Sequence, residues 1–416
     1  MTTIYIGGDV SKGYADYYIC NQNEAKLASE RFDDNSAGHA RLESLIGQFE
    51  AESIVVGVES TGGLENNWLR FFHLHLGDRA EIYRLNPLSV HKFLEFRDLH
   101  RAVDDVKSAE GIAMFLMAEP TGLRQYRPEL DEAVRQFRFI KQQQKRQTIL
   151  KTQLKNLLVI THPELVRFAR GKLSCWLLDV LVKFPTTDLL AQADPMALGA
   201  IKGLTPKKAR IIIEAAQNSV ASARTDATAT LIRSLATEVE RLNELVKHWK
   251  LELCQLLQFR EMEILCSIPG IGRWTAASLL LEVGDFTRFR SANALVAFCG
   301  LDPRPERSGD KVKQRGISRR GRRHVRGALY LPTLTCINFN SEMRAFYERL
   351  CSRGKHHYVA ITACSAKLLR IAYACVTRDT PYIERTPRRQ VEKKGSPQSI
   401  LAPVSLKEAQ KRKRPN

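Results

Sequence analysis

The chain has 416 residues, enough for two or three domains, and its hydrophobic fraction of 44% can support proper cores. A net charge of +19 favours nucleic acid over any other partner for a soluble chain. The nine cysteines show neither zinc-ligand spacing nor a disulfide framework. The N-terminus opens as a strand rather than a signal peptide, and no apolar run approaches the ~18 residues needed to span a membrane. We therefore expect a cytoplasmic, nucleoid-associated protein with reduced thiols and no membrane partner.

Strand patterns dominate the start of the chain, and strand–helix alternation follows. Asn35 and Ser36 are typical of a helix cap, and Pro87 begins a further helix. This order predicts an α/β domain, a mixed sheet with helices packed on its faces. The expected strands cover residues 3–10, 14–20, about 26–31, 54–59 and 81–85.

Acidic residues end two of these strands and begin a later helix. Asp9 and Glu59 each close an apolar run, and Asp104 and Asp105 precede a helical stretch. Carboxylates that converge on one point repel each other unless cations lie between them, and oxygen ligands of this type suit Mg²⁺. Any one of these acids alone is explained as a turn, a cap or a helix-start charge. Together they favour a Mg²⁺ site formed by Asp9, Glu59, Asp105 and Asp104.

The middle of the chain reads as helical. Residues 131–158 carry a cationic face that suits a nucleic-acid backbone or, equally well, solvent. Residues 165–216 are helical, with a cap at 203–206. Residues 227–257 have heptad spacing, which indicates a coiled coil within the chain or between subunits, or a buried helix of a bundle. The heptad positions are Ile232, Leu235, Val239, Leu242, Val246, Trp249, Leu253 and Leu256.

A turn between two apolar helices, over residues 265–283, resembles a helix-hairpin-helix. Its glycines, Gly270 and Gly272, would let the backbone approach a phosphate closely. The alternative is a structural helical turn. Residues 342–377 are helical, and a basic disordered tail is expected over 378–416.

The segment 300–327 is dense in glycine, proline and cations, which favours a loop or hairpin. Ser308 beside a flexible glycine, in a cationic cradle, has what attack on a phosphodiester requires. Ser318 is a rival for this role, and a basic surface loop with an incidental serine is the alternative. The predicted nucleic-acid contacts here are Arg304, Arg307, Lys311, Lys313, Arg315, Arg319, Arg320, Arg322, Arg323 and Arg326.

Two sets of motifs, in this order, resemble one known family. The first half has GGDVSK at 7–12, ESTG at 59–62 and an acidic helix start. The second half has IPGIG at 268–272, then GLDPR, the Ser-Gly step and GISRRG. Together they are similar to the DEDD transposases of insertion sequences, relatives of the pilin-gene invertase.

The resemblance implies a RuvC/ribonuclease H-like domain with the acids Asp9, Glu59 and Asp105, and Ser308 as nucleophile. It also implies a bridge-RNA-guided recombinase. Ser108 stands where the family usually has a further acid, and it is a poorer metal ligand. Three outcomes are open for the missing ligand: Asp104 takes its place, water completes the metal's coordination shell, or this copy of the enzyme is impaired.

We therefore expect a transposase that cuts and rejoins DNA by metal- and serine-dependent transesterification. Donor and target DNA, a guide RNA and a homo-oligomer, dimer or tetramer, are the expected partners. A RuvC-like structure-selective endonuclease is the alternative, and a non-catalytic nucleic-acid-binding protein is the third reading. The expected domains are a catalytic domain (1–160), a helical linker and coiled coil (161–260), a mainly α transposase domain (261–377) and the tail (378–416).

Overall fold

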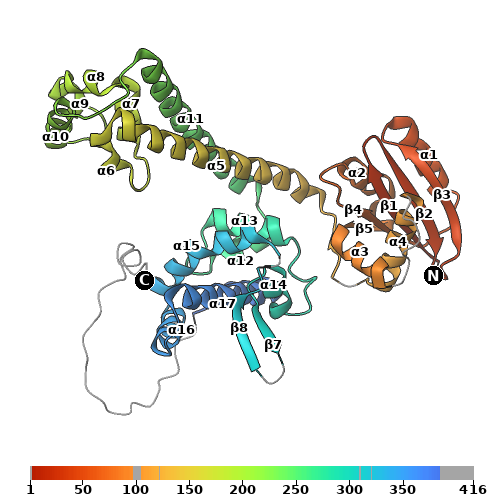
Figure 1. The fold of residues 1–416 in the computed structure, drawn as a ribbon. Coiled ribbons are helices and arrows are strands. Elements are labelled where there is room, and N and C mark those ends of the chain that lie inside the picture. The colour runs from red at the N-terminus through yellow and green to blue at the C-terminus, as the bar shows by residue number, and fades with distance from the viewer. Residues whose placement is uncertain (1, 97–104, 121, 309–310, 320, 385–416) are drawn as a thin grey trace, which may run out of the picture. The chain divides into compact units, whose positions relative to one another are not determined.

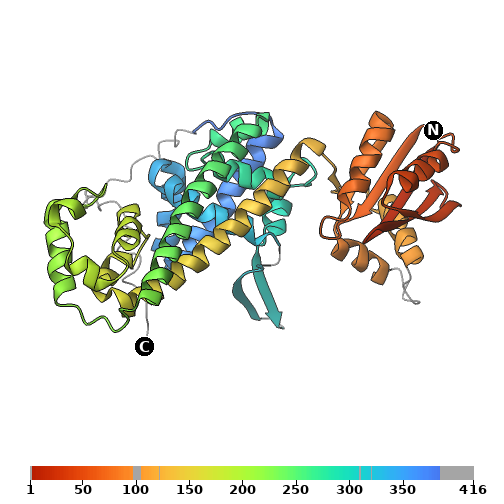
Figure 2. The ribbon, with the colours of Figure 1, turned by 90° about the horizontal axis from the view of Figure 1, so that it is seen from above.

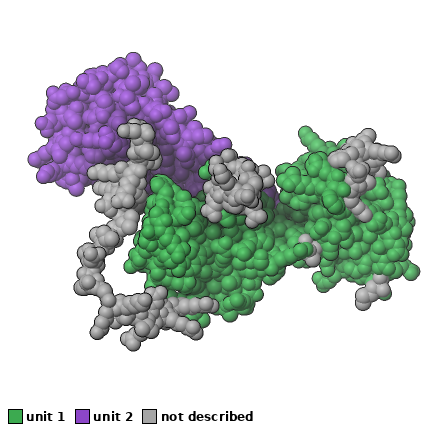
Figure 3. All heavy atoms as spheres, turned by 60° about the horizontal axis from the view of Figure 1, so that its bottom comes forward, with its two compact units in different colours: residues 1–132, 258–416 green, residues 133–257 purple. Residues whose placement is uncertain are grey.

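The computed structural model describes residues 2–96, 105–120, 122–308, 311–319 and 321–384. Asp104, Arg320 and most of the predicted tail, from residue 385 on, lie outside the described residues, as do the side chains of 105–107, 304–308 and 311–315. Residues 133–257 form one compact unit, and the chain on either side of them forms the other (Figure 3). The domain boundaries expected at 160 and 260 stay predictions.

The N-terminal region is built on a mixed sheet, as the sequence predicted, and the structure adds a sixth strand to the five that were expected. Its strand order is β3-β2-β1-β4-β5-β6 (Figure 1). β1 pairs antiparallel with β2 and parallel with β4, and β4 pairs parallel with β5. The strands are β1 (Thr3–Ser11), β2 (Tyr14–Asn21), β3 (Lys26–Asp33), β4 (Ser53–Glu59), β5 (Ala80–Leu85) and β6 (Arg124–Gln125).

Alternation of side chains along the strands gives this sheet two different faces. Ile4 and Ile6 of β1 pack in one core with residues of α1 (Ser36–Ile46) and α2 (Asn66–Leu76). Tyr5, between them, packs on the opposite side with residues of α3 (Pro87–Phe96) and α4 (Asp105–Ala118). The sheet is therefore the middle of three layers. Asn35 caps α1 as predicted, because its side chain accepts from the Gly38 amide.

The second unit consists mainly of two long helices and a helical tip. Helices α5 (Pro128–Thr161) and α11 (Asp226–Leu256) lie side by side in both ribbon views (Figures 1 and 2), and Gln147 of α5 donates to Asn243 of α11 at 2.8 Å. The tip holds η2 (Pro163–Leu165), α6 (Val166–Ala169), α7 (Cys175–Lys183), α8 (Thr187–Ala191), α9 (Pro195–Gly199) and α10 (Pro206–Gln217).

The heptad stripe of α11 is mostly buried, and Ile232 and Val239 belong to the core of the helical tip. Five of its eight positions are buried, and Leu235 packs partly against the same core. Leu256, at the end of the stripe, is 56% exposed. The structure thus gives the stripe a packing role within the chain. The buried positions are Ile232, Val239, Leu242, Val246 and Leu253.

The C-terminal region is mainly helical and carries one hairpin. Its elements are α12 (Arg260–Cys266), α13 (Arg273–Val283), α14 (Ala292–Phe298), β7 (Pro303–Ser308), β8 (Lys311–Ile317), α15 (Arg323–Phe339), α16 (Ser341–Ser352) and α17 (His357–Thr377).

Two expectations for this region need correction. The loop or hairpin expected up to residue 327 ends earlier, because α15 begins at Arg323 and buries Val325 and Leu329 one turn apart. The expectation that no run approaches a membrane span is also wrong by length and composition, since α17 has a mean hydropathy of 1.5 over an 18-residue window. That window is 56% buried, and α17 packs against α12, α14, α15 and α16.

Candidate active site

Asp9 and Glu59 lie on neighbouring strands at the same level of the sheet. The parallel register pairs Gly7 with Gly57 and Gly8 with Val58, so Asp9 and Glu59 occupy the next positions. Gly7 and Gly57 both face α4, and Asp9 and Glu59 each lie two residues further along the same strand. Because every second side chain of a strand points to the same side, both acids lie on the face that α4 covers. Burial raises the pKa of the Glu59 carboxyl, and the negative charge of Asp9 raises it further, whereas His91 lowers it. Two acids thus lie close together here, and their negative charges repel each other.

Gly7 lets helix α4 approach β1 backbone to backbone. A Cβ atom on Gly7 would lie 2.2 Å from the Ala109 carbonyl oxygen and 2.5 Å from the Ala113 amide nitrogen. Further along α4, Met117 contacts Cys20, which pairs in register with Tyr5. The helix therefore runs antiparallel to β1 and begins toward the Asp9 end of that strand.

This crossing brings the start of α4 to the two acids. Asp105 is the first residue of α4 and lies one turn before Ala109, a step of about 6 Å along the helix. Asp9 is two residues beyond Gly7, a step of about 6.6 Å in the same direction. The backbone of Asp105 is thus carried to the level of Asp9. Its side chain and the whole of Asp104 lie outside the described part of the chain, and Ser108 is half-buried in the first turn.

The described residues fit a divalent cation in part. Carboxylate oxygens are the ligands that Mg²⁺ prefers, and a cation would relieve the opposition between Asp9 and Glu59. Within the residues that the structure describes, no group of three or more His, Cys, Asp or Glu side chains could hold a metal ion. The expected third ligand, Asp105, belongs to the side chains not described, so the four-ligand set stays a prediction.

A buried carboxylate that sequence reasoning missed fixes the loop after Glu59. Glu65 is 1% exposed. It accepts from the Ser60 hydroxyl at 3.1 Å, from the Thr61 amide at 3.2 Å and from the Gly63 amide at 2.8 Å. Three donors on one carboxylate hold the turn that leaves β4, and with it the direction of Glu59.

Arg84 of β5 balances the charge of Glu65. Its Nε lies 3.5 Å from the Glu65 carboxylate, and its guanidinium donates to Asp131 at 2.8 Å and to Asn66 at 2.7 Å. All three charged side chains are almost completely buried. The sequence shows an acid shortly after the E-S-T-G motif, but its partners lie 19 and more residues away, so no local pattern identifies the network.

Ser308 lies at the tip of the β7–β8 hairpin. It is the last residue of β7 and pairs with Lys311, the first residue of β8. Ser318 follows β8 at the opposite end, where its hydroxyl donates to the Asp302 carboxylate at 2.5 Å and its amide to the Asp302 carbonyl at 2.9 Å. The structure therefore separates the two candidate serines, with one at the tip and one tied into the base.

The predicted cationic contacts divide into three groups. Arg322 and Arg326 make internal contacts, at 3.8 Å to Glu282 and at 2.7 Å to the Cys299 carbonyl. Arg319 and Arg323 are exposed. The side chains of the remaining six lie outside the described part, and their role stays a prediction: Arg304, Arg307, Lys311, Lys313, Arg315 and Arg320.

The two glycines of the helix-hairpin-helix-like turn have different surroundings. Gly270 has a φ of +90°, and a Cβ there would lie 2.3 Å from the Pro332 carbonyl oxygen, so it packs against α15. Gly272 caps α13 and is exposed, with nothing within 4 Å of an added Cβ. Gly270 is thus explained by packing, whereas Gly272 is open to a ligand.

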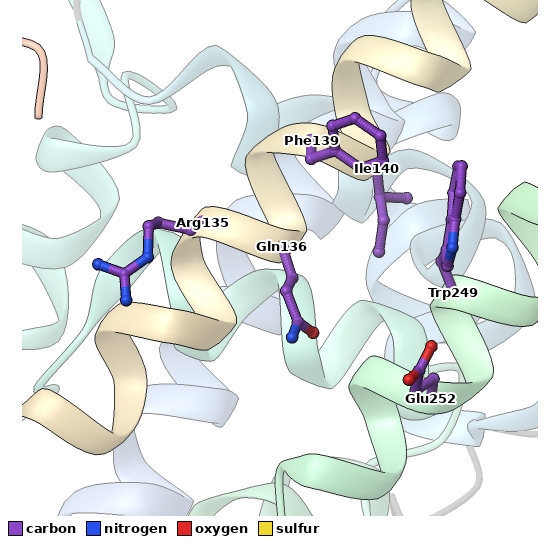
Figure 4. Close-up of a pocket in the computed structure, with 6 residues that line it drawn as sticks. All are labelled: Arg135, Gln136, Phe139, Ile140, Trp249 and Glu252. Atoms are coloured by element: carbon purple, nitrogen blue, oxygen red, sulfur yellow. The ribbon is translucent and has the colours of Figure 1, made fainter.

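A hollow between α5 and α11 lies outside every predicted site. Figure 4 shows Phe139 and Ile140 of α5 facing Trp249 of α11, with Arg135, Gln136 and Glu252 completing the lining. The rings of Phe139 and Trp249 meet edge to face, with centroids 5.1 Å apart. This hollow is a feature of the helix pair, and Trp249 is one of the predicted heptad positions.

Comparison with known proteins identifies the family. A model described as "Transposase" for the DEDD domain of IS110 elements matches residues 6–163, and one described as "Transposase IS116/IS110/IS902 family" matches residues 262–348. The chain belongs to the IS110 family of DEDD transposases. The first match covers the sheet from Ile6 onward, with Asp9 and Glu59, and the start of α4 with Asp105; the second match covers the serine hairpin.

The curated IS110 relatives match over part of their length. A 43.6 kDa protein of insertion element IS110 from Streptomyces coelicolor is 27% identical over 56% of this chain and 60% of its own length. A pilin gene-inverting protein from Moraxella bovis is 32% identical over 37% of this chain and 48% of its own length. The chain thus spans about half the length of these relatives. RuvC from Thermus thermophilus covers 30% of this chain at 13% identity, with a TM-score of 0.23.

Proposed function

We propose that this chain is a transposase and site-specific DNA recombinase that cuts DNA strands and rejoins them. The observation that carries the proposal is the convergence of Asp9 and Glu59 on one sheet face, at the level where α4 begins with Asp105. A cation there would relieve the opposed charges of Asp9 and Glu59, and the start of α4 at Asp105 supports a third acid beside them. The similarity to proteins named for inverting a pilin gene supports rejoining rather than cutting alone.

Asp9, Glu59 and Asp105 would hold Mg²⁺, with Asp104 as a further ligand in place of the acid that Ser108 replaces. When bound, Mg²⁺ would neutralise these carboxylates and stabilise negative charge on a phosphate oxygen. The chain's own contribution is placement. The strand register sets the separation of Asp9 and Glu59, and Glu65 fixes the loop that follows. Because these contacts exist before substrate arrives, little reorganisation is needed at the moment of reaction.

Ser308 would be the nucleophile. Its hydroxyl oxygen forms a bond to phosphorus while the bond from phosphorus to a deoxyribose oxygen breaks. The hydroxyl proton leaves to solvent, and the departing deoxyribose oxygen takes one up. The phosphoserine link conserves the ester until a hydroxyl of another strand reverses the step. Its position at a hairpin tip suits contact with DNA, while Ser318 is engaged with Asp302.

The partners would be donor DNA, target DNA and a guide RNA, all bound by a homo-oligomer of this chain. The net charge of +19 supports polyanionic partners, and the family resemblance suggests the guide. Exposed cations near the hairpin, among them Arg319 and Arg323, supply contacts to phosphates. Binding should therefore weaken steeply with salt, by roughly a decade or more between ~50 and ~200 mM.

A covalent-adduct assay tests the proposal. The chain, purified with whatever nucleic acid accompanies it, is incubated with Mg²⁺ and with labelled DNA carrying sequences recovered in that purification. A denaturing gel should show a protein–DNA adduct that disappears in Ser308→Ala and in Asp9→Asn. Clean metal-dependent nicks without any adduct would instead indicate the endonuclease. Full activity in Asp9→Asn would contradict the metal site.

A further inference from the structure

An exposed basic surface in the helical tip of the second unit has no assigned role. Five cations surround the turn between α9 and α10, and we name this surface the tip patch: Arg167, Lys202, Lys207, Lys208 and Arg210. Lys208 lies 3.9 Å from the Trp176 ring centroid and 4.8 Å from that of Phe168, and Arg167 lies over Phe168 at 4.7 Å. A Cβ on Gly203 would lie 3.7 Å from Trp176, so the turn packs against the same ring that Lys208 covers.

Among the residues that the structure describes, the cations of the tip patch are not held in ion pairs, although the exposed Glu214 lies one turn after Arg210 on α10. None of its five cations takes part in an ion pair within the part of the chain that the structure describes. Asp194, the acid beside α9, is engaged in accepting from the Met196 and Ala197 amides. Like charges that are gathered without paired counter-charges favour a polyanion.

The turn inside the tip patch repeats the helix-hairpin-helix-like turn of the C-terminal region, 67 residues earlier in the chain. Gly203 and Gly270 both have a φ of +90°. The Leu204 amide donates to the Ile201 carbonyl at 2.9 Å, as the Ile271 amide does to Ile268 at 3.0 Å. The residues that cap the following helices, Thr205 and Gly272, have φ values of −83° and −82°.

The match extends through the packing of both hairpins. The Ala209 amide donates to the Thr205 carbonyl at 2.9 Å, and the Ala276 amide to the Gly272 carbonyl at 2.9 Å. The apolar residues at equivalent positions are buried in both: Ile201 and Ile268, Leu204 and Ile271, Ala209 and Ala276, Ile212 and Leu279. One supersecondary unit therefore occurs twice. The tip copy has three cations within its turn and first helical residues, Lys202, Lys207 and Lys208, whereas the C-terminal copy has one, Arg273.

We propose that the tip patch is a second surface that binds the sugar–phosphate backbone of duplex DNA, in a different unit of the chain from the acids and the serine hairpin. Lysines that flank a close-approach turn contact phosphates without reading sequence. A duplex fits better than a single strand, because stacking of unpaired bases needs exposed rings. Here Trp176 is buried, and two cations cover Phe168. The inference rests on the proposed function in one respect, the identity of the polymer as DNA.

The test compares two triple variants of the full chain in EDTA, so that cleavage plays no part. In Lys202→Gln/Lys207→Gln/Arg210→Gln the tip patch loses three exposed cations. In Lys247→Gln/Arg353→Gln/Lys355→Gln three exposed cations elsewhere are lost. Fluorescence anisotropy with a random-sequence 20-base-pair duplex should show binding at least about tenfold weaker at ~100 mM salt for the patch variant alone. Its log–log salt slope should be smaller by roughly 2 to 3.

A charge-preserving variant, Lys202→Arg/Lys207→Arg/Arg210→Lys, should bind as the wild type does, which separates charge from folding. Equal losses in the two glutamine variants would overturn the tip patch as a site, as would a loss confined to structured RNA. A wild-type chain that binds no duplex at all would overturn the proposed function itself, and this inference with it.

Discussion

The acids and the serine are held in opposite ways. Around Asp9 and Glu59, almost every backbone position is fixed by the sheet register, by α4 against Gly7 and by the buried carboxylate of Glu65. Ser308 instead lies at the tip of a two-stranded hairpin, whose described side-chain anchor is at the base, between Ser318 and Asp302. One half of the proposed site is embedded in a core, and the other is presented by an extended element.

This difference fits a division of labour. Carboxylates that receive a cation must already be in place, because their mutual repulsion would otherwise separate them. A nucleophile that first attacks one strand and later releases it to another benefits from an element that can follow the DNA. We therefore expect small backbone changes near the acids to lower activity strongly, and changes at the base of the hairpin to be tolerated.

The largest effect should come from filling the space where α4 meets β1. In Gly7→Ala, the new Cβ would lie 2.2 Å from the Ala109 carbonyl oxygen, so α4 must move by about 1 Å. A displacement of about 1 Å of a catalytic group can cost ~100-fold in rate, and adduct formation should fall by about that factor. Single-turnover adduct formation with Mg²⁺ measures the change.

A matched glycine provides the control for this prediction. An added Cβ on Gly171 meets nothing within 4 Å, so Gly171→Ala should retain the wild-type rate. Circular dichroism and binding of duplex DNA in EDTA should show that Gly7→Ala remains folded. A folded Gly7→Ala with normal activity would mean that the approach of α4 does not position Asp105.

The next largest effect should come from Glu65→Gln. A glutamine amide has one acceptor oxygen, so its NH2 group must face either the Thr61 and Gly63 amides or the Ser60 hydroxyl and Arg84, and Arg84 loses one of its two buried counter-charges. Leaving such groups unsatisfied costs about 1–3 kcal/mol each, and Glu59 loses its fixed direction. Adduct formation should fall by about tenfold, and the Mg²⁺ concentration for half-maximal rate should rise. A merely structural role would lower the rate without changing that concentration, and the exposed Glu43→Gln should change neither.

Sequence patterns could predict the elements of this site better than its contacts. Apolar runs that end in Asp9 and Glu59 identify two strands, and the mixed sheet they predict is confirmed. The antiparallel crossing of α4 at Gly7 depends on one residue without a side chain, which no periodicity marks. The pairing of Glu65 with Arg84, and of Arg84 with Asp131, joins residues 19 and 47 positions apart, and such charge networks have no local signature.

The smallest effect should come from Ser318→Ala, at the base of the hairpin. The change removes one hydrogen bond, from the Ser318 hydroxyl to Asp302, which is worth about 1–3 kcal/mol because the acceptor is charged. The Ser318 amide still donates to the Asp302 carbonyl, so the hairpin keeps its register and Ser308 stays at the tip. Adduct formation should therefore fall by no more than a few-fold, and Ser318→Thr, which restores a hydroxyl, should recover it. The same denaturing gel measures the adduct for both serine variants. If the adduct vanishes in Ser318→Ala and persists in Ser308→Ala, the nucleophile is Ser318 at the base of the hairpin. The tolerance expected at that base would then be wrong.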